Sequence, residues 1–451
     1  MSTRAIVLAA GKGTRMKSAR SKMLHELCGR PMLWHVLRAL HDAGITDVTV
    51  VSSGDVTNQI GELAASAGHL TVRSVVQEPQ LGTGHAVGMA LGEMPAGEGT
   101  IVVLNGDMPL VDSALVRDVI DACAGALALV TVRMDLPSSF GRIVRDGSQL
   151  SRIVEARDAT EGELAIDEMN AGLYAYDEPK LRAAIAELRN ENAQAEYYLT
   201  DTIAHFVRRG ERVAPVPAPE PASVLGVNDR IELAAASALL NRRLCQHHMR
   251  AGVTIVDPAT TYLEPDLEFA SDVTILPNTT IGRGSRIGAH SEIGPNARLS
   301  GAVVGEHVVL ADSVVVDSEI GDFSIVGPWA HVRADSHVGT GARIGNFVEV
   351  KKSHLSPGVK AGHLSYLGDS TIGPRSNIGA GTITCNFDGE AKHVTTIGAD
   401  VFVGSNSSLV APVTLGDGSA TGAGTVVIRD VAPGERVVGN PGRPLPRKEA
   451  T

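Results

Sequence analysis

The sequence predicts two folds in one chain: an α/β Rossmann-like domain followed by a parallel β-helix. Two observations support this. Up to about residue 226, apolar β-branched runs alternate with amphipathic helical stretches, a pattern typical of a mostly parallel sheet with helices on both faces. From about residue 253, an aliphatic–glycine pair recurs at a six-residue period, which is the hexapeptide repeat of a β-helix.

The first half contains six expected strands and helical stretches between them. The strands are expected at Ala5–Ala10, Val48–Ser53, Val72–Gln77, Thr100–Leu104, Ala126–Arg133 and Asn170–Tyr176, and helices at Met32–Ala43 and Val56–Ala67. Ligands of such sheets bind at the carboxyl ends of the strands. The loop after Ala10 and the turn after Leu104 are therefore the expected sites.

A glycine-rich, basic segment follows the first expected strand, in Leu8-Ala9-Ala10-Gly11-Lys12-Gly13-Thr14-Arg15-Met16. From Met1 to His25 the chain carries six basic residues and no acidic one. Backbone N–H groups of such a loop face phosphate oxygens while ammonium groups neutralise their charge. Met16 replaces the third glycine of a dinucleotide loop, and the Walker pattern is absent. A basic surface turn is the alternative interpretation.

A second candidate is the carboxylate of Asp107, in the Asn105-Gly106-Asp107 turn after the strand that ends at Leu104. Beside a phosphate loop, a carboxylate at a strand end can hold Mg²⁺ against the phosphates. The alternative is an ordinary turn aspartate. A second glycine turn, Glu78 to His85, either binds ligand or simply starts a helix.

Prolines and one helix separate the two halves. The residues Pro215, Pro217, Pro219 and Pro221 are expected to mark an exit from regular structure, because proline fits neither a helix interior nor a sheet ladder. A helix is expected from Asp229, a plausible N-cap, to Arg250. It would connect two bodies.

The hexapeptide repeat points each aliphatic residue into the core of a coil. The pairs with glycine begin at Ile281, Ile287, Ile293, Val304, Ile320, Val326, Val338, Ile344, Ile372, Ile378, Ile397, Val403 and Leu415. Two stretches break the rhythm, Asn346–Tyr366 and Thr382–Thr395. We expect excursions there, and loops on a rigid coil often carry function.

The net charge, the cysteine spacing and the length of the apolar runs argue against several classes of function. A net charge of −11 argues against a nucleic-acid surface. The four cysteines are widely spaced, without a Cys-x-x-Cys, which indicates reduced thiols in a cytoplasmic protein. No apolar run approaches the length of a membrane helix.

Taken in order, the first-half motifs resemble the GlmU family of bifunctional N-acetylglucosamine-1-phosphate uridylyltransferases and glucosamine-1-phosphate acetyltransferases. Ser21 replaces the proline of the family's Pro-Lys pair. The resemblance implies a uridylyltransferase domain over residues 1–227, with a UTP and UDP-N-acetylglucosamine site at Leu8, Gly11, Arg15, Lys22, Gln77, Gly82, Thr83, Gly141, Glu155, Asn170 and Asn228. In that site Gln77, Gly82 and Thr83 would recognise the uracil, and Gly141, Glu155 and Asn170 the N-acetylglucosamine. Asp107 and Asn228 would hold Mg²⁺.

Large polar residues on a coil otherwise built from small ones mark a second candidate site. His363 lies inside the first rhythm break, near several cations. A neutral histidine can take a proton from an attacking amine, although a lone histidine is more often plain surface. The family resemblance implies a linker helix over 228–250 and a left-handed β-helix acetyltransferase domain with a C-terminal tail over 251–451. His363 would be the base, and Arg333, Lys351, Tyr366, Asn377 and Lys392 would bind glucosamine 1-phosphate. Acetyl-CoA would meet Ala380, Asn386, Ser405 and Ala423, with Asn386 also orienting the sugar phosphate. Asn440 stands where the family often places a coenzyme-binding arginine.

The resemblance also implies a homotrimer that uses acetyl-CoA, UTP, glucosamine 1-phosphate and N-acetylglucosamine 1-phosphate, with no nucleic-acid or membrane partner. Three alternatives remain: a single-activity sugar-phosphate nucleotidylyltransferase with a structural β-helix, a zinc hydratase solenoid using His331, His337 and His363, and a non-catalytic scaffold.

Overall fold

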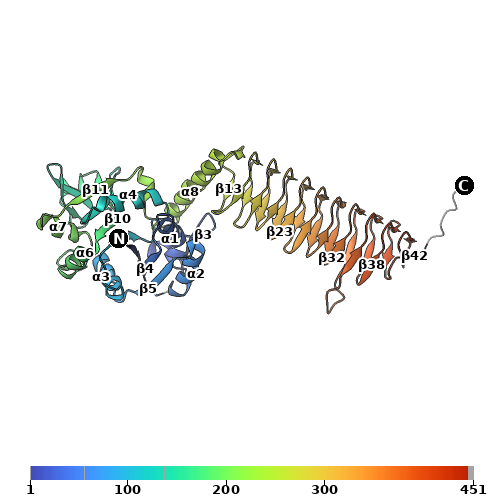
Figure 1. Ribbon diagram of the computed structural model, residues 1–451, viewed down its shortest axis with the longest axis horizontal. Helices are drawn as coiled ribbons and strands as arrows, with labels where there is room; N and C mark the ends of the chain where they lie inside the picture. Colours follow the sequence, from blue (N-terminus) through green and yellow to red (C-terminus); the bar gives the residue numbers. More distant parts are fainter. Residues whose placement is uncertain (1, 55, 137, 445–451) are drawn as a thin grey trace. The chain divides into compact units, whose positions relative to one another are not determined.

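The computed structural model describes residues 2–54, 56–136 and 138–444 (Figure 1). The chain folds into two compact units, Met1–Leu240 and Asn241–Thr451. Most of the expected C-terminal tail, residues 445–451, lies outside the described residues. No helix among the described residues is long and apolar enough to cross a membrane.

The first unit is built on one twisted sheet whose strands follow the order β11-β7-β10-β6-β1-β4-β5. Neighbours β6, β1, β4 and β5 are parallel, β10 runs antiparallel to both of its neighbours, and β8 and β9 form an attached antiparallel pair. The bounds are β1 (Thr3–Ala9), β4 (Asp47–Ser52), β5 (Thr71–Val76), β6 (Thr100–Asn105), β7 (Leu127–Arg133), β8 (Arg142–Asp146), β9 (Gln149–Val154), β10 (Glu168–Asp177) and β11 (Val213–Pro217); a small pair, β2 (Glu26–Leu27) and β3 (Arg30–Pro31), lies outside this sheet.

Helices cover both faces of this sheet. Their bounds are α1 (Met32–Asp42), α2 (Thr57–Gly68), α3 (Thr83–Glu93), α4 (Ser113–Cys123), α5 (Glu161–Leu164), α6 (Glu178–Ala186) and α7 (Asp201–Arg208), with short 3₁₀ turns η1 (Thr14–Met16), η2 (Lys22–Leu24) and η3 (Pro221–Val224). Alternate residues of β1 enter different cores, because successive side chains of a strand point to opposite faces. Ala5 and Val7 join the core with α1, α2 and α4, whereas Ile6 joins the core with α3, α6 and α7.

All six predicted strands and both predicted helices are present, with ends within a residue or two of their predicted bounds. The prediction that the prolines leave regular structure was wrong for Pro215 and Pro217. Both lie in β11, which pairs in parallel with β7. This strand is the last in the sheet order, and an edge strand tolerates proline because one side of its backbone has no ladder partner.

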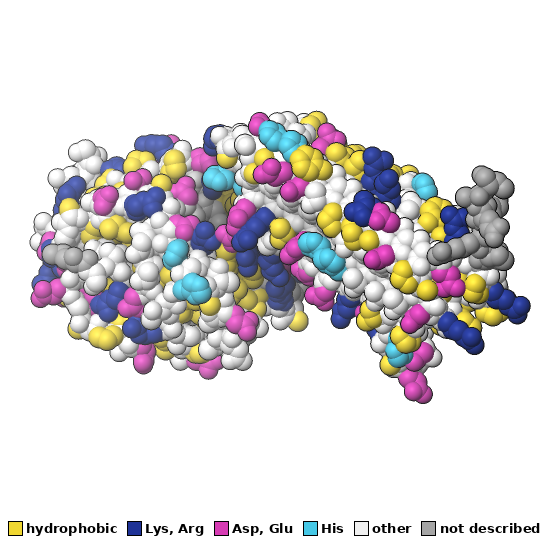
Figure 2. Space-filling view, turned by 45° about the vertical axis from the view of Figure 1, so that its right-hand side comes forward, with side chains coloured by type: hydrophobic (Ala, Val, Ile, Leu, Met, Phe, Trp, Pro, Cys, Tyr) yellow, Lys and Arg dark blue, Asp and Glu magenta, His cyan; other side chains and the backbone are white. Residues whose placement is uncertain are grey.

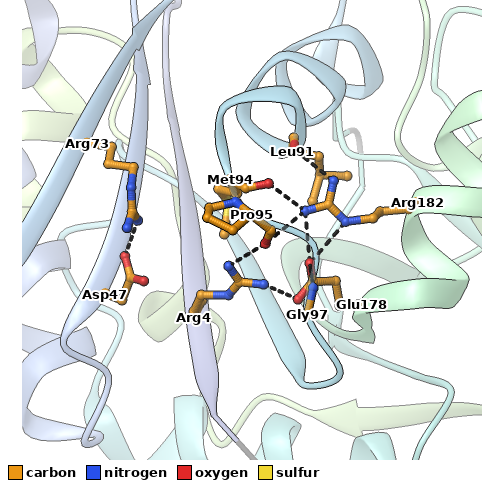
Figure 3. Close-up of polar contacts among 9 residues, drawn as sticks. All are labelled: Arg4, Asp47, Arg73, Leu91, Met94, Pro95, Gly97, Glu178 and Arg182. Atoms are coloured by element: carbon orange, nitrogen blue, oxygen red, sulfur yellow. Dashed lines mark hydrogen bonds and ion pairs between the residues drawn. The ribbon is translucent and has the colours of Figure 1, made fainter.

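A buried ion-pair network fixes the amino-terminal end of β1 (Figure 3). The Glu178 side chain is fully buried at the start of α6 and pairs with Arg4 and with Arg182. Arg182 also donates to the carbonyls of Leu91 and Met94, at 2.7 and 3.0 Å. One carboxylate thereby holds together β1, α6 and the end of α3. The Arg73–Asp47 pair, also drawn in Figure 3, joins β5 to β4.

The second unit is a parallel β-helix whose short strands stack into three sheets (Figure 1). The first sheet contains β12 (Thr254–Ile255), β15 (Thr274–Ile275), β18 (Glu292–Ile293), β21 (Val309–Leu310), β24 (Ile325–Val326), β27 (Arg343–Asn346), β30 (Lys360–His363), β33 (Asn377–Ile378), β36 (Phe402–Val403), β39 (Ala420–Thr421), β41 (Arg436–Val438) and β42 (Arg443–Pro444). The second contains β13 (Tyr262–Leu263), β16 (Thr280–Ile281), β19 (Arg298–Ser300), β22 (Val314–Val316), β25 (His331–Val332), β28 (Glu349–Lys351), β31 (Tyr366–Gly368), β34 (Ile383–Cys385), β37 (Ser408–Val410) and β40 (Val426–Val427). The third contains β14 (Glu268–Phe269), β17 (Arg286–Ile287), β20 (Val303–Val304), β23 (Ser318–Ile320), β26 (Ser336–Val338), β29 (His354–Leu355), β32 (Ser370–Ile372), β35 (Thr395–Ile397) and β38 (Val413–Leu415).

The two rhythm breaks have different causes. The expected excursion at Asn346–Tyr366 is absent, because this stretch stays in the ladders as β27 to β31. The aliphatic residues Val350 and Leu355 keep their inward positions, and only the glycine after them is replaced. The second break does contain an excursion, a hairpin over residues 386–393 closed by an antiparallel bridge between Phe387 and Lys392. The hairpin projects from the stack of coils (Figure 1).

The helix α8 (Arg230–Arg250) contains the boundary between the two units. Asp229 caps it, accepting from the backbone N–H groups of Ile231 and Glu232 at 2.8 and 2.9 Å. In its first half Ala236 packs into a core of the first unit, and in its second half Cys245 packs into the core of the β-helix.

Candidate functional sites

Two adjoining cavities of about 290 and 450 Å³ lie at the carboxyl ends of β1 and β6 in the first unit. Both are lined by Leu8, Arg15, Thr83, Asn105, Asp107 and Asn228. The larger cavity is also lined by Gly11, Lys22, Gln77 and Gly82, and the smaller by Gly141, Glu155 and Asn170. Every residue predicted for the first site thus faces one of the two cavities, and the predicted uracil and N-acetylglucosamine groups separate between them, apart from Thr83, which lines both.

The glycine-rich loop passes close to Lys22. Gly13 has a φ of 58°, and a Cβ there would lie 2.6 Å from the Lys22 Cβ, so only glycine fits. Ser21 has a φ of −54°, within the range that proline imposes. Serine therefore preserves the turn, and the buried Lys22 side chain points to the cavity.

The Lys22 ammonium binds the two predicted metal ligands at the junction of the cavities. Its Nζ lies 2.6 Å from Asp107 Oδ2 and 2.9 Å from Asn228 Oδ1. A carboxylate oxygen and an amide oxygen thus converge on one point. Among the described residues, no group of three or more His, Cys, Asp and Glu side chains is arranged to hold a metal. His337, one of the three histidines considered for a zinc site, stacks on His354 with ring centroids 4.7 Å apart.

Hydrogen bonds fix the side chains of the larger cavity. The buried Gln77 donates from Nε2 to the Gly82 carbonyl at 2.9 Å, and this nitrogen lies 3.1 Å from His85 Nδ1. Gln80 donates to the carbonyl of Ala10 and so ties the second glycine turn to the first loop. No role was predicted for Gln80, although its place inside that turn was a usable signal.

Burial raises the pKa of two groups that line the smaller cavity. Glu155 accepts a hydrogen bond from Thr200 Oγ1 at 2.9 Å, and burial raises the pKa of its carboxyl group. Asn170 donates from Nδ2 to Tyr174 Oη at 2.6 Å, and burial raises the pKa of the Tyr174 phenol well above its usual value. Asn105, for which no role was predicted, lines both cavities.

On the β-helix, three predicted cations gather over the second sheet. Arg333 and Lys351 follow the inward residues of the neighbouring strands β25 and β28, so they occupy the same position on successive coils. Arg333 pairs with Glu349 at 2.7 Å. Lys392, from the hairpin, faces Lys351, which lowers the pKa of Lys392 because two ammonium groups repel each other.

Tyr366 and Asn386 belong to the same cluster. Tyr366 lies opposite Glu349 in the ladder, and Asn386 Nδ2 lies 3.4 Å from its phenol oxygen. Asn386 also donates to Asp369, a residue that no sequence motif had indicated. We define the cation cluster as Arg333, Lys351, Tyr366, Asn386 and Lys392.

His363 and three residues predicted for acetyl-CoA form one column at the corner between the first and second sheets. Each lies two residues after an inward residue of successive strands β30, β33, β36 and β39. Backbone hydrogen bonds join each member to the next coil. The N–H after Ala380 donates to the His363 carbonyl at 3.3 Å, the N–H after Ser405 to the Ala380 carbonyl at 2.7 Å, and the N–H after Ala423 to the Ser405 carbonyl at 2.7 Å. The column therefore runs from His363 to Ala423. We call these four residues the corner column.

The structure does not join all predicted acetyltransferase residues by direct contact. Among the described residues, no hydrogen bond or ion pair links the exposed His363 side chain to the cation cluster. Asn377 lies on the first sheet, beside Lys360. Asn386 lies in the cation cluster and not in the corner column.

Comparison with known proteins matches a family domain to each half of the chain. Residues 5–225 match the MobA-like NTP transferase domain, residues 317–352 the bacterial transferase hexapeptide with six repeats, and residues 394–429 the hexapeptide repeat of succinyl-transferase. The chain is 43% identical over 439 residues to "Bifunctional protein GlmU" of Trichlorobacter lovleyi, covering 95% of this chain and 94% of that protein. It is 44% identical to the proteins of the same name from Brevibacillus brevis and Mycolicibacterium gilvum, covering 95% and 96% of this chain and 92% and 88% of theirs.

The chain belongs to the GlmU family. The hexapeptide matches identify the second unit as a left-handed parallel β-helix. Relatives named bifunctional match over nearly the whole chain, which supports a bifunctional enzyme that makes UDP-N-acetylglucosamine over a single-activity nucleotidylyltransferase with a structural β-helix. The chain contains a domain for each transferase activity of the family, the NTP transferase domain for nucleotidyl transfer and the hexapeptide repeats for acyl transfer.

Proposed function

We propose that each unit carries one of the two activities. The β-helix acetylates glucosamine 1-phosphate from acetyl-CoA, and the α/β unit then joins the product to UMP from UTP, releasing pyrophosphate. The observation that carries this proposal is the corner column, which begins at His363 and continues through Ala380, Ser405 and Ala423 on successive coils. Columns of backbone hydrogen bonds recur along the whole coil. A scaffold, however, has no use for a histidine that heads a column of small residues and lies three residues before Tyr366 of the cation cluster.

In the acetylation step, the substrate amine attacks the thioester carbonyl of acetyl-CoA. The C–N bond forms, the C–S bond breaks, His363 takes the amine proton, and the coenzyme leaves as a thiolate that this proton can neutralise. Arg333, Lys351 and Lys392 bind the phosphate, while Tyr366, Asn377 and Asn386 orient the sugar. The corner column spans three strand spacings, about 14 Å, which suits the extended arm of the coenzyme.

In the uridylyl step, a phosphate oxygen of N-acetylglucosamine 1-phosphate attacks the α-phosphorus of UTP. Such a reaction needs positioning and neutralised charge more than a nucleophilic side chain. The amides after Gly11, together with Arg15 and Lys22, meet the triphosphate, and Leu8, Gln77, Gly82 and Thr83 the uridine. The sugar occupies the smaller cavity, against Gly141, Glu155 and Asn170.

Asp107 and Asn228 fit Mg²⁺, because hard cations prefer oxygen ligands. The carboxylate oxygen of Asp107 and the amide oxygen of Asn228 already converge on one cation, the Lys22 ammonium. When bound, the ion would neutralise phosphate charge and orient the triphosphate. Calorimetric titration of UTP with and without Mg²⁺ tests this apart from turnover: Asp107→Ala should abolish the metal-dependent part of the affinity. Equal metal dependence in wild type and variant would contradict the assignment.

We also propose a homotrimer that works in the cytoplasm on these small molecules, without nucleic-acid or membrane partners. The support is an exposed apolar ladder next to the corner column. Trp329 stacks on Phe347 at 5.3 Å, and Leu364 follows on the next coil. These side chains are 55%, 58% and 63% exposed, and contiguous apolar surface marks interaction sites. Light scattering should give three times the chain mass, and a monomer with full acetyltransferase activity would refute the trimer.

One assay tests the two activities together. The full chain is supplied with glucosamine 1-phosphate, acetyl-CoA, UTP and Mg²⁺, and thiol and pyrophosphate are scored separately. Thiol release should need no UTP, and pyrophosphate release should need acetyl-CoA unless N-acetylglucosamine 1-phosphate is added. Pyrophosphate released from glucosamine 1-phosphate without acetyl-CoA would contradict the proposed order.

A further inference from the structure

The hairpin over residues 386–393 is closed by contacts of its own. His393 donates its backbone N–H to the Asn386 carbonyl at 2.8 Å, and Phe387 and Lys392 form the antiparallel bridge above it. The hairpin projects from the coil (Figure 1), and acidic, histidine and apolar side chains gather on the projecting part (Figure 2). A two-stranded hairpin alone is marginally stable in water, so its side chains must define its shape.

Asp388 makes most of these side-chain contacts. Its Oδ1 accepts from the backbone N–H groups of Glu390 and Ala391, both at 2.8 Å, and its Oδ2 lies 2.6 Å from His393 Nε2. These hydrogen bonds favour the ionised carboxylate and hold its pKa well below the usual range. One side chain therefore joins the turn of the hairpin to its returning strand.

Lys392 lies between residues that this carboxylate fixes, Ala391 on one side and His393 on the other. The base of the hairpin is bound beside the coil of Lys351, because Asn386 donates to Asp369 and the Asp369 backbone N–H donates to the Lys351 carbonyl at 3.0 Å. The Lys351 ammonium lowers the pKa of Lys392, because the two like charges repel each other. A phosphate dianion placed between the two ammonium groups would then meet both without reorganising the loop.

We propose that Asp388 and His393 are positioning residues for sugar-phosphate binding, because together they hold the hairpin in the conformation that presents Lys392 to Lys351. This inference rests on the proposed function of the β-helix as the acetyltransferase. Neither residue needs to touch the substrate. They act through Lys392.

Steady-state acetylation by the full-length protein tests the inference through a double-mutant cycle. Asp388→Ala and His393→Ala should each raise the KM for glucosamine 1-phosphate about tenfold and change kcat less than about twofold, as loss of a charge-assisted phosphate contact predicts. Asp388→Asn keeps an oxygen for the two N–H groups and should recover part of the loss. In the Lys392→Ala background, Asp388→Ala should add nothing, because the group it positions is gone.

The matched control is Asp400→Ala, which also removes an exposed, paired carboxylate from the coil, here bound to Arg375. It should leave the KM unchanged, and uridylyl transfer should be normal in every variant. Equal KM increases from Asp388→Ala with and without Lys392 would overturn the inference, as would a normal KM in Asp388→Ala when Lys392→Ala raises it. A normal KM in Lys392→Ala itself would overturn the sugar-phosphate assignment as well.

Discussion

At the scale of single residues, the cation cluster depends on one glycine. Gly368 follows Arg333 and Lys351 in the same position on the next coil. A Cβ at Gly368 would overlap the phenol of Tyr366, which lies over it. Glycine is therefore required here by the close approach of a ring.

Gly368→Ala should displace the Tyr366 ring and raise the KM for glucosamine 1-phosphate, by about tenfold if one phosphate- or sugar-binding contact is lost. Acetylation kinetics measure this directly. Uridylyl transfer by the same variant is the internal control and should be unchanged. An unaltered KM would mean that Tyr366 does not bind the substrate.

The glycine loop, the strand-end Asp107 and the histidine among cations are local patterns that the sequence displays, whereas residues such as Glu155 and Ser405 were assigned only through the family resemblance. The stacking of the corner column could not be predicted from local patterns. Ala380 and Ser405 are adjacent on neighbouring coils, yet 25 residues apart, against 17 between His363 and Ala380. The hairpin accounts for the difference, and only the ladder register reveals the contact. The role of Asp388 could not be predicted either, because the closure of the hairpin decides which residues it contacts.

At the scale of elements, the first sheet is fastened by the Glu178 network of Figure 3. Glu178→Ala should destabilise the first unit by about 3 kcal/mol, because it leaves Arg4 and Arg182 without their carboxylate in a largely buried place. Urea unfolding monitored by circular dichroism measures the loss. Arg73→Ala, which breaks a half-exposed pair, should cost less than about 1 kcal/mol. Equal losses would contradict the role given to burial.

The second half of α8 packs a histidine against the coil. The His248 ring meets Phe269 at 4.7 Å, and burial lowers its pKa from the usual 6.5 to about 4. Between these values the unfolded chain binds a proton that the folded chain does not, so stability falls as pH drops from 6.5 towards 4.

We therefore expect the β-helix to lose about 1–2 kcal/mol between pH 7.5 and pH 5 through His248 alone. His248→Leu should reduce the pH dependence by that amount. The readout is urea unfolding of both full-length proteins at the two pH values. The same slope in both would show that His248 is not the group responsible.

Periodicity explains which elements were predictable. The aliphatic–glycine repeat specifies inward residues at fixed spacing, so the β-helix follows from the sequence. A proline pattern carries less information, because an edge strand such as β11 accepts Pro215 without losing its ladder. Likewise the stretch around Val350 lacks the glycines yet keeps its place in the coil.

At the scale of the whole molecule, we infer that one chain carries two independent sites. The candidate uridylyl site draws its lining from residues up to Asn228, and the corner column and cation cluster draw theirs from Arg333 onward. The two units have separate hydrophobic cores. Within the described part of the chain, neither site takes a lining residue from the other unit.

The most direct test is to measure both activities of full-length Asp107→Ala and His363→Ala, with thiol and pyrophosphate release assayed separately and N-acetylglucosamine 1-phosphate supplied for the second. Asp107→Ala should lose uridylyl transfer and acetylate at the wild-type rate. His363→Ala should lose acetylation by about 10²–10⁴-fold, the share of a positioned general base, and keep uridylyl transfer. Loss of both activities in either folded variant would contradict two independent sites.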